Sequence, residues 1–313
     1  MKKKIILRLS NEIGNQMFMY ASALSISKKM NRELLLDNET AFLLKKNISK
    51  YGLNNFKITA KIADENFKFK KLKGYIKRKF LHKIDLFKKD KTFYQEPKNK
   101  KKITSFNNDF INRNFSDVLY LEGHFESEKY FFDYKNNILN EFEFIDSELF
   151  KKNYYYDKIL NTNAVGICLR QNRFNEGKGR DNQNNRIKSQ KYTNQQIEYI
   201  NKSASIIKKK IKNPIFYIWS NDLENINFNN FEFHLEPVNL NSTTDVSDIR
   251  ALSLFLLSQC KHFITIPSTF NWWGAWLSKN KNKIITRPKN EFFSDFYVNN
   301  LDFWPKNWLS IGK

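Results

Sequence analysis

The sequence predicts an α/β protein with parallel sheets, and three observations lead to this class. The apolar run Lys4–Leu9 is followed by a loop, by a stretch with helical spacing at Gln16–Met30, and by a second apolar run at Arg32–Asp37. This order is a β-loop-α-β unit, which is typical of parallel sheets. A second series of the same kind opens with the apolar run Ala164–Arg170. The length of 313 residues suits two domains of about 150 residues each.

The rest of the first half is more varied. Residues 61–105 interleave Lys and Arg with Phe, Leu, Ile and Tyr. We expect a solvated helical insertion with an apolar stripe; the alternative is a surface that touches anionic lipid or a lipid-linked substrate. Val118–Phe131 predicts a strand, a turn and the start of a helix. Residues 150–163 are polar and aromatic, as in a connection between domains, and we place the domains at 1–158 and 159–313.

The second half continues as alternating strands and helices. The strands are expected at Asn213–Asp222, at Lys261–Ile266 and, as the last one, at Lys283–Pro288. The helices are expected at Asp245–Cys260, whose acidic first turn suits the helix dipole, and at Pro267–Asn280. Three tryptophans of the second helix stand at helical spacing, which favours core packing over a ligand platform; they are Trp272, Trp273 and Trp276.

Composition restricts the partners and the compartment. There are 54 Lys and Arg against 32 Asp and Glu, a net charge of +22, which favours nucleic acid, an anionic membrane or a phosphate-bearing substrate. Cys168 and Cys260 lie in or next to apolar runs, so we expect small buried side chains and no disulfide-rich scaffold. The apolar run near the start ends at Arg8, too early for a signal peptide, and no stretch reaches the length of a membrane span. We therefore expect a cytoplasmic protein, with any peripheral contact at the inner face of the membrane.

Polar side chains follow three strands of the second half. They are Arg170–Arg173, Ser220–Asp222 and Ser268–Thr269. Open α/β sheets bind ligands at the carboxyl ends of their strands, so these groups are expected to converge on one crevice. Backbone N–H groups at the helix start after Ser268 and the guanidinium of Arg170 would then bind one anion, and a diphosphate fits.

Each of these groups also has an ordinary structural interpretation. Ser268–Thr269 would only cap a helix, Asp222 would only close a turn, and Arg170 would only pair with a structural acid. Three polar strand ends in consecutive units favour a shared site over three separate structural roles.

Several common chemistries lack their sequence patterns here. There is neither a G-x-x-x-x-G-K-[ST] loop nor a G-x-G-x-x-G fingerprint. The four histidines are scattered without metal-ligand spacing, and no Asp-x-Asp pair is present. We therefore expect neither a metal nor a cofactor.

Four segments resemble glycosyltransferase family 11, the α-1,2-fucosyltransferases. "LSNEIGNQMFMYASALSISKK" resembles the "GGLGNQMFQYA" opening of the family, and "LEGHFESEKYF" resembles its "L-x-G-Y-x-Q-S-E-K-Y-F". "IWSND" resembles its "F-S-D-D". The longest match, "DIRALSLFLLSQCKHFITIPSTFNWWGAWL", resembles "D-x-x-L-M-S-x-C-x-H-x-I-I-x-N-S-T-F-S-W-W-G-A-W-L". The matches run in the family order from Arg8 to about Lys279.

The resemblance implies a fold and an activity. The fold would be GT-B-like, with two Rossmann-type halves and a cleft between them. The donor would be GDP-β-L-fucose, held mainly by the C-terminal half, and the fucose would pass with inversion to the 2-hydroxyl of a terminal galactose, without a metal. The alternatives are another fucosyl linkage, α-1,6 or to protein, and a member that binds the donor without transferring it. A nucleic-acid-binding protein is the alternative from another class, but no segment resembles a nucleic-acid motif.

The resemblance also assigns residues near Arg170. "CLRQNRF" aligns with the family motif H-x-R-R-G-D, and Arg170 takes the place of the first arginine, which contacts the donor diphosphate. Cys168 stands for the histidine, Gln171 for the second arginine, Asn172 for the glycine and Arg173 for the aspartate.

Three catalytic roles and a donor site follow as expectations. Arg170 would stabilise charge on the leaving phosphate, Glu176 is the candidate base, and Asn15 would orient the sugar or the acceptor. The expected donor-binding residues are Arg170, Asn172, Arg173, Ser220, Asp222, Ser268, Thr269, Phe270, Gly14 and Gln16. The acceptor would be a glycan of an O-antigen or another surface polysaccharide, selected by residues 61–105 and 175–195.

Overall fold

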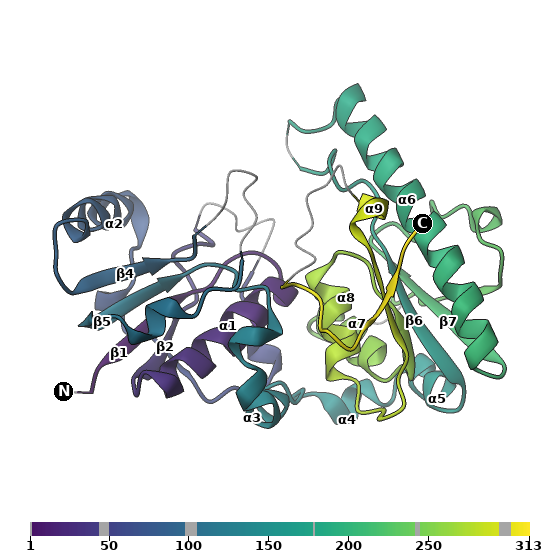
Figure 1. Ribbon diagram of the computed structural model, residues 1–313, viewed down its shortest axis with the longest axis horizontal. Coiled ribbons are helices and arrows are strands. Elements are labelled where there is room, and N and C mark those ends of the chain that lie inside the picture. Colours follow the sequence, from purple (N-terminus) through teal and green to yellow (C-terminus); the bar gives the residue numbers. More distant parts are fainter. Residues whose placement is uncertain (1, 44–49, 98–104, 178, 242–244, 294–301) are drawn as a thin grey trace. The chain divides into compact units, whose positions relative to one another are not determined.

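The protein divides into two compact α/β units, each with its own sheet (Figure 1). The first unit comprises the residues up to 145 together with residues 302–305, and the second comprises residues 146–293 and 306–313. The computed structural model describes residues 2–43, 50–97, 105–177, 179–241, 245–293 and 302–313. The expectation of an α/β protein with parallel sheets is confirmed in both units.

The sheet of the first unit has the strand order β3-β2-β1-β5-β4, and its pairings are parallel. The strands are β1 (Lys4–Arg8), β2 (Glu33–Asp37), β3 (Lys61–Ile62), β4 (Lys91–Gln95) and β5 (Phe115–Glu122). The central strand β1 carries the fully buried run Ile5, Ile6 and Leu7, as expected for a parallel strand covered on both faces. All carboxyl ends therefore lie at one edge of the sheet.

Helix α1 (Ile13–Lys29) follows β1 and is buried on almost every side. It carries no charged residue before Lys28 and Lys29, whose position in the last turn suits the helix dipole. A helix with apolar or small residues all round is a core helix, and its aromatic side chains Phe18 and Tyr20 are fully buried. The other helices of this unit are α2 (Lys71–Asp85) and α3 (Lys135–Glu141), with short 3-10 turns at Leu53–Asn55, Glu65–Phe67, Asp109–Asn112, Glu128–Tyr130 and Phe132–Tyr134.

The segment 61–105 is only partly the helical insertion expected from its charge pattern. Its middle forms the exposed helix α2, but its flanks form β3 and β4, which are strands of the sheet. The apolar side chains Phe93 and Tyr94 of β4 are buried. Because lysines surround them in the sequence, the strand was not predicted. Residues 98–104 of this segment lie outside the described residues.

The sheet of the second unit has the order β11-β10-β9-β6-β7-β8, again with parallel pairings. The strands are β6 (Asn163–Leu169), β7 (Pro214–Ser220), β8 (Leu235–Pro237), β9 (His262–Ile264), β10 (Ile285–Pro288) and β11 (Leu309–Ile311). The strand expected to be last, β10, is followed by β11, which forms the edge of the sheet.

The helices of the second unit are α4 (Ser147–Phe150), α5 (Tyr154–Leu160), α6 (Gln183–Lys210), α7 (Ile249–Ser258), α8 (Thr269–Leu277) and α9 (Asn290–Phe293), with a 3-10 turn at Phe228–Asn230. Helices α7 and α8 pack closely: a Cβ atom added to Gly274 would overlap the side chain of Leu257. The core role expected for Trp272, Trp273 and Trp276 is confirmed, since all three are buried.

Two expectations about this unit need adjustment. Residues 150–163, expected as a connection between domains, contain α5 and belong to the second unit, where the ring of Tyr156 stacks on that of Phe255. Helix α7 begins later than expected, because Asp248 caps it: its Oδ1 accepts a hydrogen bond of 3.0 Å from the backbone N–H of Arg250.

Candidate active site

The end of β6 is fixed by hydrogen bonds to one buried side-chain amide. Gln196, a fully buried residue of α6, accepts a hydrogen bond from the backbone N–H of Arg170 (2.9 Å) and donates one to its carbonyl oxygen (2.8 Å). Both backbone groups of Arg170 are thus satisfied by one side chain, and the position of this residue at the carboxyl edge of the sheet is fixed.

The ends of β6 and β7 are joined by side-chain amides. Asn221 accepts a hydrogen bond from the backbone N–H of Gln171 (2.9 Å) and donates one to its carbonyl oxygen (3.1 Å). The side chain of Gln171 donates to Ser220 Oγ and to the carbonyl oxygen of Asp222. Asn172, which has a left-handed backbone with φ of 56°, donates to Asp222 Oδ2 at 2.9 Å. Two of the three polar strand ends predicted to converge therefore do so.

The guanidinium of Arg170 forms an ion pair with Glu176, six residues later in the same loop. Glu176 also accepts a hydrogen bond of 2.9 Å from Asn221 Nδ2. Both side chains of the ion pair are partly exposed, so the guanidinium remains open to solvent on its other side. The carboxylate thus orients the arginine.

The neighbouring arginine is packed rather than free. The guanidinium of Arg173 lies over the ring of Tyr192, with 5.2 Å from Cζ to the ring centroid. Burial raises the pKa of the Tyr192 hydroxyl, and the positive charges of Arg173 and Arg170 oppose that rise. Burial likewise raises the pKa of the thiol of Cys168, so the residue that stands for the histidine of the motif is a neutral thiol.

The third polar strand end precedes α8. Ser268 is the N-cap residue, and its side chain makes no cap hydrogen bond, while Thr269 and Phe270 in the first turn are partly exposed. The strand order places this helix start beside the end of β6, because β9 and β6 are neighbours. Asn271 is fully buried; its Oδ1 accepts from the backbone N–H of Ile266 at 2.7 Å, and its Nδ2 has no hydrogen-bond partner among the described residues. The helix start therefore presents uncapped donors at the carboxyl edge of the sheet.

A second polar cluster lies in the first unit, after β1 and β5. Asn15, in the first turn of α1, donates a hydrogen bond of 2.8 Å to Glu126 Oε1. His124 Nδ1 lies 3.5 Å from the same oxygen, and its Nε2 lies 2.8 Å from Asn11 Nδ2. Glu126 and His124 are partly exposed. The sequence reasoning singled out Asn15 but missed Glu126, its hydrogen-bond partner, and His124, which contacts Glu126. The quoted family pattern has Gln at the position of Glu126 and Tyr at the position of His124.

Gln16 has a structural role in the first unit. Its fully buried amide donates to the carbonyl oxygens of Asn11 (2.7 Å) and Lys50 (2.9 Å), and it accepts from the backbone N–H of Gly52 at 2.9 Å. Gln16 thus ties two loops to the start of α1, next to Gly14. Donor contacts by Gln16 and Gly14 stay predictions.

Comparison with known proteins decides the family. The model of glycosyl transferase family 11 matches residues 1–312. The protein belongs to glycosyl transferase family 11. The family resemblance predicted from the four segments is therefore confirmed, and the chain is a member of a glycosyltransferase family over its whole length.

Two relatives from Escherichia coli align with this family 11 protein over nearly their full lengths. One is named Alpha-1,2-colitosyltransferase and is 27% identical over 319 residues, covering 99% of each chain. The other is named O-antigen biosynthesis glycosyltransferase WbnK and is 25% identical over 324 residues, covering 97% of this chain and 99% of the relative.

Solved structures confirm the fold class. The fucosyltransferase NodZ from Bradyrhizobium superposes with a TM-score of 0.51 at 13% identity, covering 92% of this chain and 95% of NodZ. The NodZ α-1,6-fucosyltransferase co-crystallised with GDP gives the same TM-score at 13% identity, with 92% and 96% covered. The two parallel α/β halves expected for a GT-B-like protein are therefore present.

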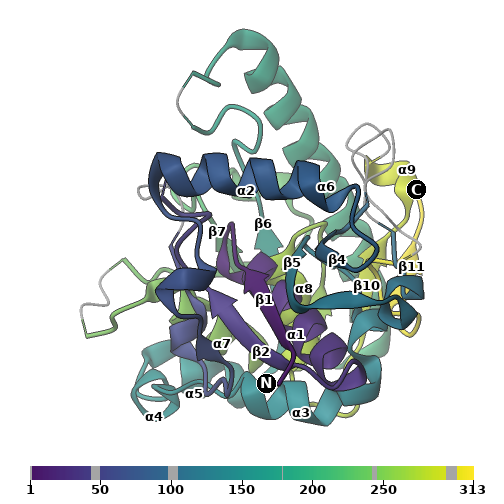
Figure 2. The ribbon, with the colours of Figure 1, turned by 90° about the vertical axis from the view of Figure 1, so that its left-hand side faces the viewer.

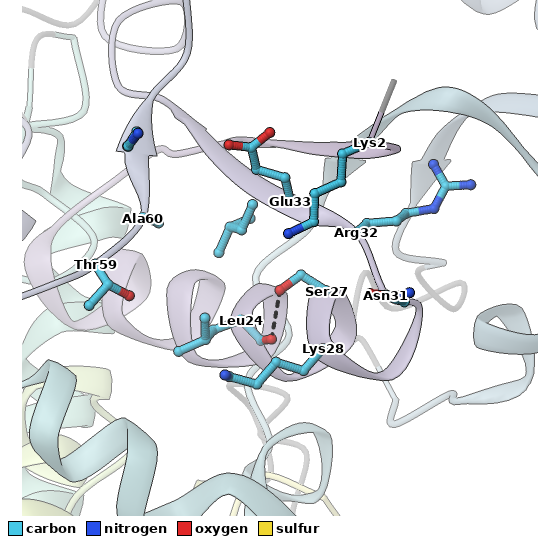
Figure 3. Close-up of a pocket in the computed structure, with 11 residues that line it drawn as sticks. Lys2, Leu24, Ser27, Lys28, Asn31, Arg32, Glu33, Thr59 and Ala60 are labelled. Carbon is cyan, nitrogen blue, oxygen red and sulfur yellow. Dashed lines mark hydrogen bonds between the residues drawn. The ribbon is translucent and has the colours of Figure 1, made fainter.

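A hollow elsewhere in the first unit lies at the wrong edge of the sheet for this site. It has a volume of about 400 Å³, and residues that line it include Lys2, Lys28, Glu33 and Lys61. Figure 3 shows the guanidinium of Arg32 pointing away from the side chains of Lys2 and Glu33. These residues surround the amino ends of β1 and β2, whereas ligands of open parallel sheets bind at the carboxyl ends. We therefore keep the strand ends described above as the candidate site of this family 11 protein.

In the part of the chain that the structure describes, no group of three or more His, Cys, Asp or Glu side chains could hold a metal ion. Cationic groups at the carboxyl edge of the second sheet include Arg170 and Arg173, which follow β6. An anion bound there would meet these guanidinium groups and the start of α8.

Proposed function

We propose that this protein is an inverting, metal-independent fucosyltransferase. It would transfer L-fucose from GDP-β-L-fucose to the 2-hydroxyl of a terminal galactose in a glycan acceptor. Membership of family 11 supports the reaction class. The α-1,2 linkage is supported by the name of the 27% identical relative, and an O-antigen or related surface polysaccharide by the name of the second relative.

The observation that carries the proposal is the setting of Arg170. Its backbone is clamped by Gln196, and its side chain is oriented by a partly exposed carboxylate, Glu176. A diphosphate that enters this edge would gain charge-assisted hydrogen bonds from a guanidinium that is already positioned. When the anomeric C–O bond breaks, negative charge grows on the β-phosphate, and preorganised donors stabilise that charge most effectively.

The start of α8 would supply the remaining donors. The first-turn N–H groups after Ser268 and the helix dipole favour a phosphate oxygen. Asn271 of the same turn has a buried Nδ2 without a hydrogen-bond partner among the described residues. Asn172, Arg173, Ser220 and Asp222 would hold the rest of the donor, as predicted from the sequence.

The acceptor would be bound by the first unit. Asn15 would orient the acceptor or the sugar, and Glu126 lies beside it. Glu176 stays a base candidate, but its two hydrogen-bonding partners in the structure give it a positioning role toward Arg170 as well. Glu126 is therefore a second candidate for removing the proton of the attacking hydroxyl.

A second candidate for the donor sugar follows from the name of the 27% identical relative. This relative is named Alpha-1,2-colitosyltransferase, so a colitosyl donor with the same linkage is the alternative to fucose. Both reactions would use the diphosphate contacts of Arg170, and only the sugar pocket would distinguish them.

Donor binding tests the proposal directly. Thermal unfolding of the purified protein is measured with GDP, GDP-fucose, GDP-mannose and UDP-galactose, each with EDTA. We expect stabilisation by GDP and GDP-fucose alone, because a ligand that binds only the folded state raises its stability. Arg170→Ala should abolish the shift. Arg186→Ala is the matched control, since this guanidinium pairs with Asp181 at the surface of the same unit. No shift with any guanine nucleotide would refute the proposed donor class.

Transfer then tests the linkage. The protein is incubated with GDP-fucose and with oligosaccharides that end in β-galactose, and the product is analysed by NMR. A new α-fucosyl residue on the 2-hydroxyl is expected. A product fucosylated elsewhere would replace the proposed linkage by another one, and transfer only from a GDP-colitose donor would replace the proposed sugar.

A further inference from the structure

Helix α2 exposes a row of apolar side chains. Leu72, Ile76, Phe80 and Ile84 recur every four residues and are exposed by 72%, 57%, 61% and 37%. Residues at this spacing lie on one face of a helix. Phe87, just beyond the helix end, is 90% exposed. Single exposed apolar residues are ordinary, but a continuous row of them marks an interaction surface.

The opposite face of α2 is anchored to the sheet by polar groups. Arg78 forms an ion pair with the buried Glu122, with 2.8 Å between its Nε and Glu122 Oε1. The ring of His82 stacks on that of Phe93 at 3.9 Å between centroids. The carboxylate of Asp85 accepts hydrogen bonds from two backbone N–H groups of β4. These contacts fix the rotation of the helix, whose ribbon lies at the border of the first unit, beside β4 (Figure 1, Figure 2). The exposed apolar row therefore lies on the face of α2 turned away from these contacts.

Lysines accompany the apolar row. Lys73, Lys77, Lys79 and Lys83 are all exposed, and the one acid of the helix is Asp85, which is buried and engaged. The turn after the helix adds two more exposed cations, Lys88 and Lys89. The outward face of α2 therefore combines apolar side chains with a dense positive charge.

The combination of charge and apolar surface determines the kind of partner. A second copy of the chain on this face would bring lysines against lysines, which is unfavourable. A membrane interface with anionic phospholipids fits both properties: the apolar side chains enter the boundary of the acyl chains, and the lysines meet the headgroup phosphates. Long lysine side chains reach from an apolar surface to the headgroups.

We propose that the outward face of α2 docks on an anionic phospholipid bilayer, with the helix parallel to the membrane plane. The contact would be peripheral: within the ranges that the structure describes, no helix is long and apolar enough to cross a bilayer. The inference does not depend on the proposed donor site, because α2 belongs to the first unit and the strand ends around Arg170 belong to the second.

Vesicle binding tests the proposal. The full chain is sedimented with large vesicles of phosphatidylcholine alone or of phosphatidylcholine with about 30 mol% phosphatidylglycerol, an anionic phospholipid. We expect binding to the anionic vesicles, little binding to the neutral ones, and a loss of binding at high salt. Ile76→Ser/Phe80→Ser should lower the partition coefficient at least about tenfold, and Lys79→Gln/Lys83→Gln should do the same.

The control variant is Phe132→Ser/Ile187→Ser, which removes two apolar side chains that are exposed to a similar degree on other elements. It should bind the vesicles as the unchanged protein does, and all variants should keep their melting temperature. The proposal would be overturned by equal binding to neutral and anionic vesicles, or by unchanged binding of the Ile76 and Phe80 variant. It would also be overturned if light scattering showed a dimer that this variant dissociates, with no vesicle binding by either protein.

Discussion

At the scale of single residues, the candidate site depends on one arginine held in place before any ligand arrives. Gln196 fixes the backbone of Arg170, and Glu176 fixes its side chain. A guanidinium that needs no reorganisation stabilises a developing phosphate charge at a lower cost in free energy than a mobile one. The carboxylate also compensates the positive charge until the diphosphate binds.

Two replacements of Arg170 should show how much its charge and how much its planar guanidinium contribute to kcat. Arg170→Ala should lower kcat by about 10²- to 10³-fold, the effect of removing one preorganised donor to a developing anion. Arg170→Lys keeps the charge but loses the planar fork, so we expect a smaller loss, about tenfold. Steady-state kinetics with GDP-fucose would measure both, and circular dichroism would confirm that the fold persists. Equal activity of all three proteins would exclude Arg170 from the reaction.

Replacement of Glu126 and replacement of Glu176 should impair different steps, the first proton removal and the second GDP binding. Glu126→Gln would lower kcat by about 10²- to 10⁴-fold if Glu126 accepts the proton of the acceptor hydroxyl, with little change in GDP affinity. Glu176→Gln should mainly weaken or alter GDP binding, because it loosens Arg170. Isothermal titration with GDP and kinetics with a saturating acceptor distinguish the two roles. The reverse pattern would return the base to Glu176, the residue chosen from the sequence.

At the scale of elements, the sequence predicts the strands that are apolar throughout and misses the elements whose buried faces are polar. The runs around β1, β6 and β7 were predicted within one or two residues at each end. Helix α6 was not predicted, because its buried face includes Ser189, Thr193, Gln196 and Ser203, which give no apolar periodicity. Since Gln196 clamps Arg170, the missed helix is the one that positions the site.

The residues of the candidate site likewise differ in whether a local sequence pattern predicts them. Strand ends and the family motif pointed to Arg170, Ser220 and Ser268, since their positions follow from local patterns. Gln196, Glu126 and His124 contribute through contacts with residues more than 20 positions away along the chain, namely Arg170, Asn15 and Asn11. No local pattern in one sequence encodes such contacts.

The anchor between α2 and the sheet should show in the pH dependence of stability. Burial alone would raise the pKa of the Glu122 carboxyl, but His82, Arg78 and Arg8 lower it from 4.5 to about 2. A carboxyl with a lowered pKa in the folded state stabilises the protein fully above about pH 4.5. That stabilisation is lost as the pH falls through about 2.

Glu122→Gln should therefore lower the free energy of unfolding by about 3 kcal/mol at pH 7, and the difference from the unchanged protein should shrink below pH 4.5. Urea unfolding followed by circular dichroism at several pH values measures both. Glu148→Gln is the control, because Glu148 pairs with Lys151 at the surface and should change little. A difference that stays constant down to pH 3 would contradict the assigned pKa.

At the scale of the whole molecule, the two units carry different parts of the proposed reaction. The cationic strand ends and the start of α8 lie in the second unit, whereas Asn15, Glu126 and the basic helix α2 lie in the first. A polysaccharide acceptor carried by a membrane lipid would suit a first unit that both holds the acceptor and contacts the bilayer.

Hydrogen exchange of the full chain would test whether the second unit binds the donor and the first unit binds the acceptor. GDP should slow amide exchange at residues 170–176, 220–222 and 268–271, because it would order the strand ends and the helix start that hold the diphosphate. An oligosaccharide acceptor should instead protect the segment around Asn15 and residues 124–126. Arg170→Ala should remove the first pattern and leave the second. Protection by GDP confined to the first unit would reverse the roles of the two units and would place the diphosphate away from Arg170.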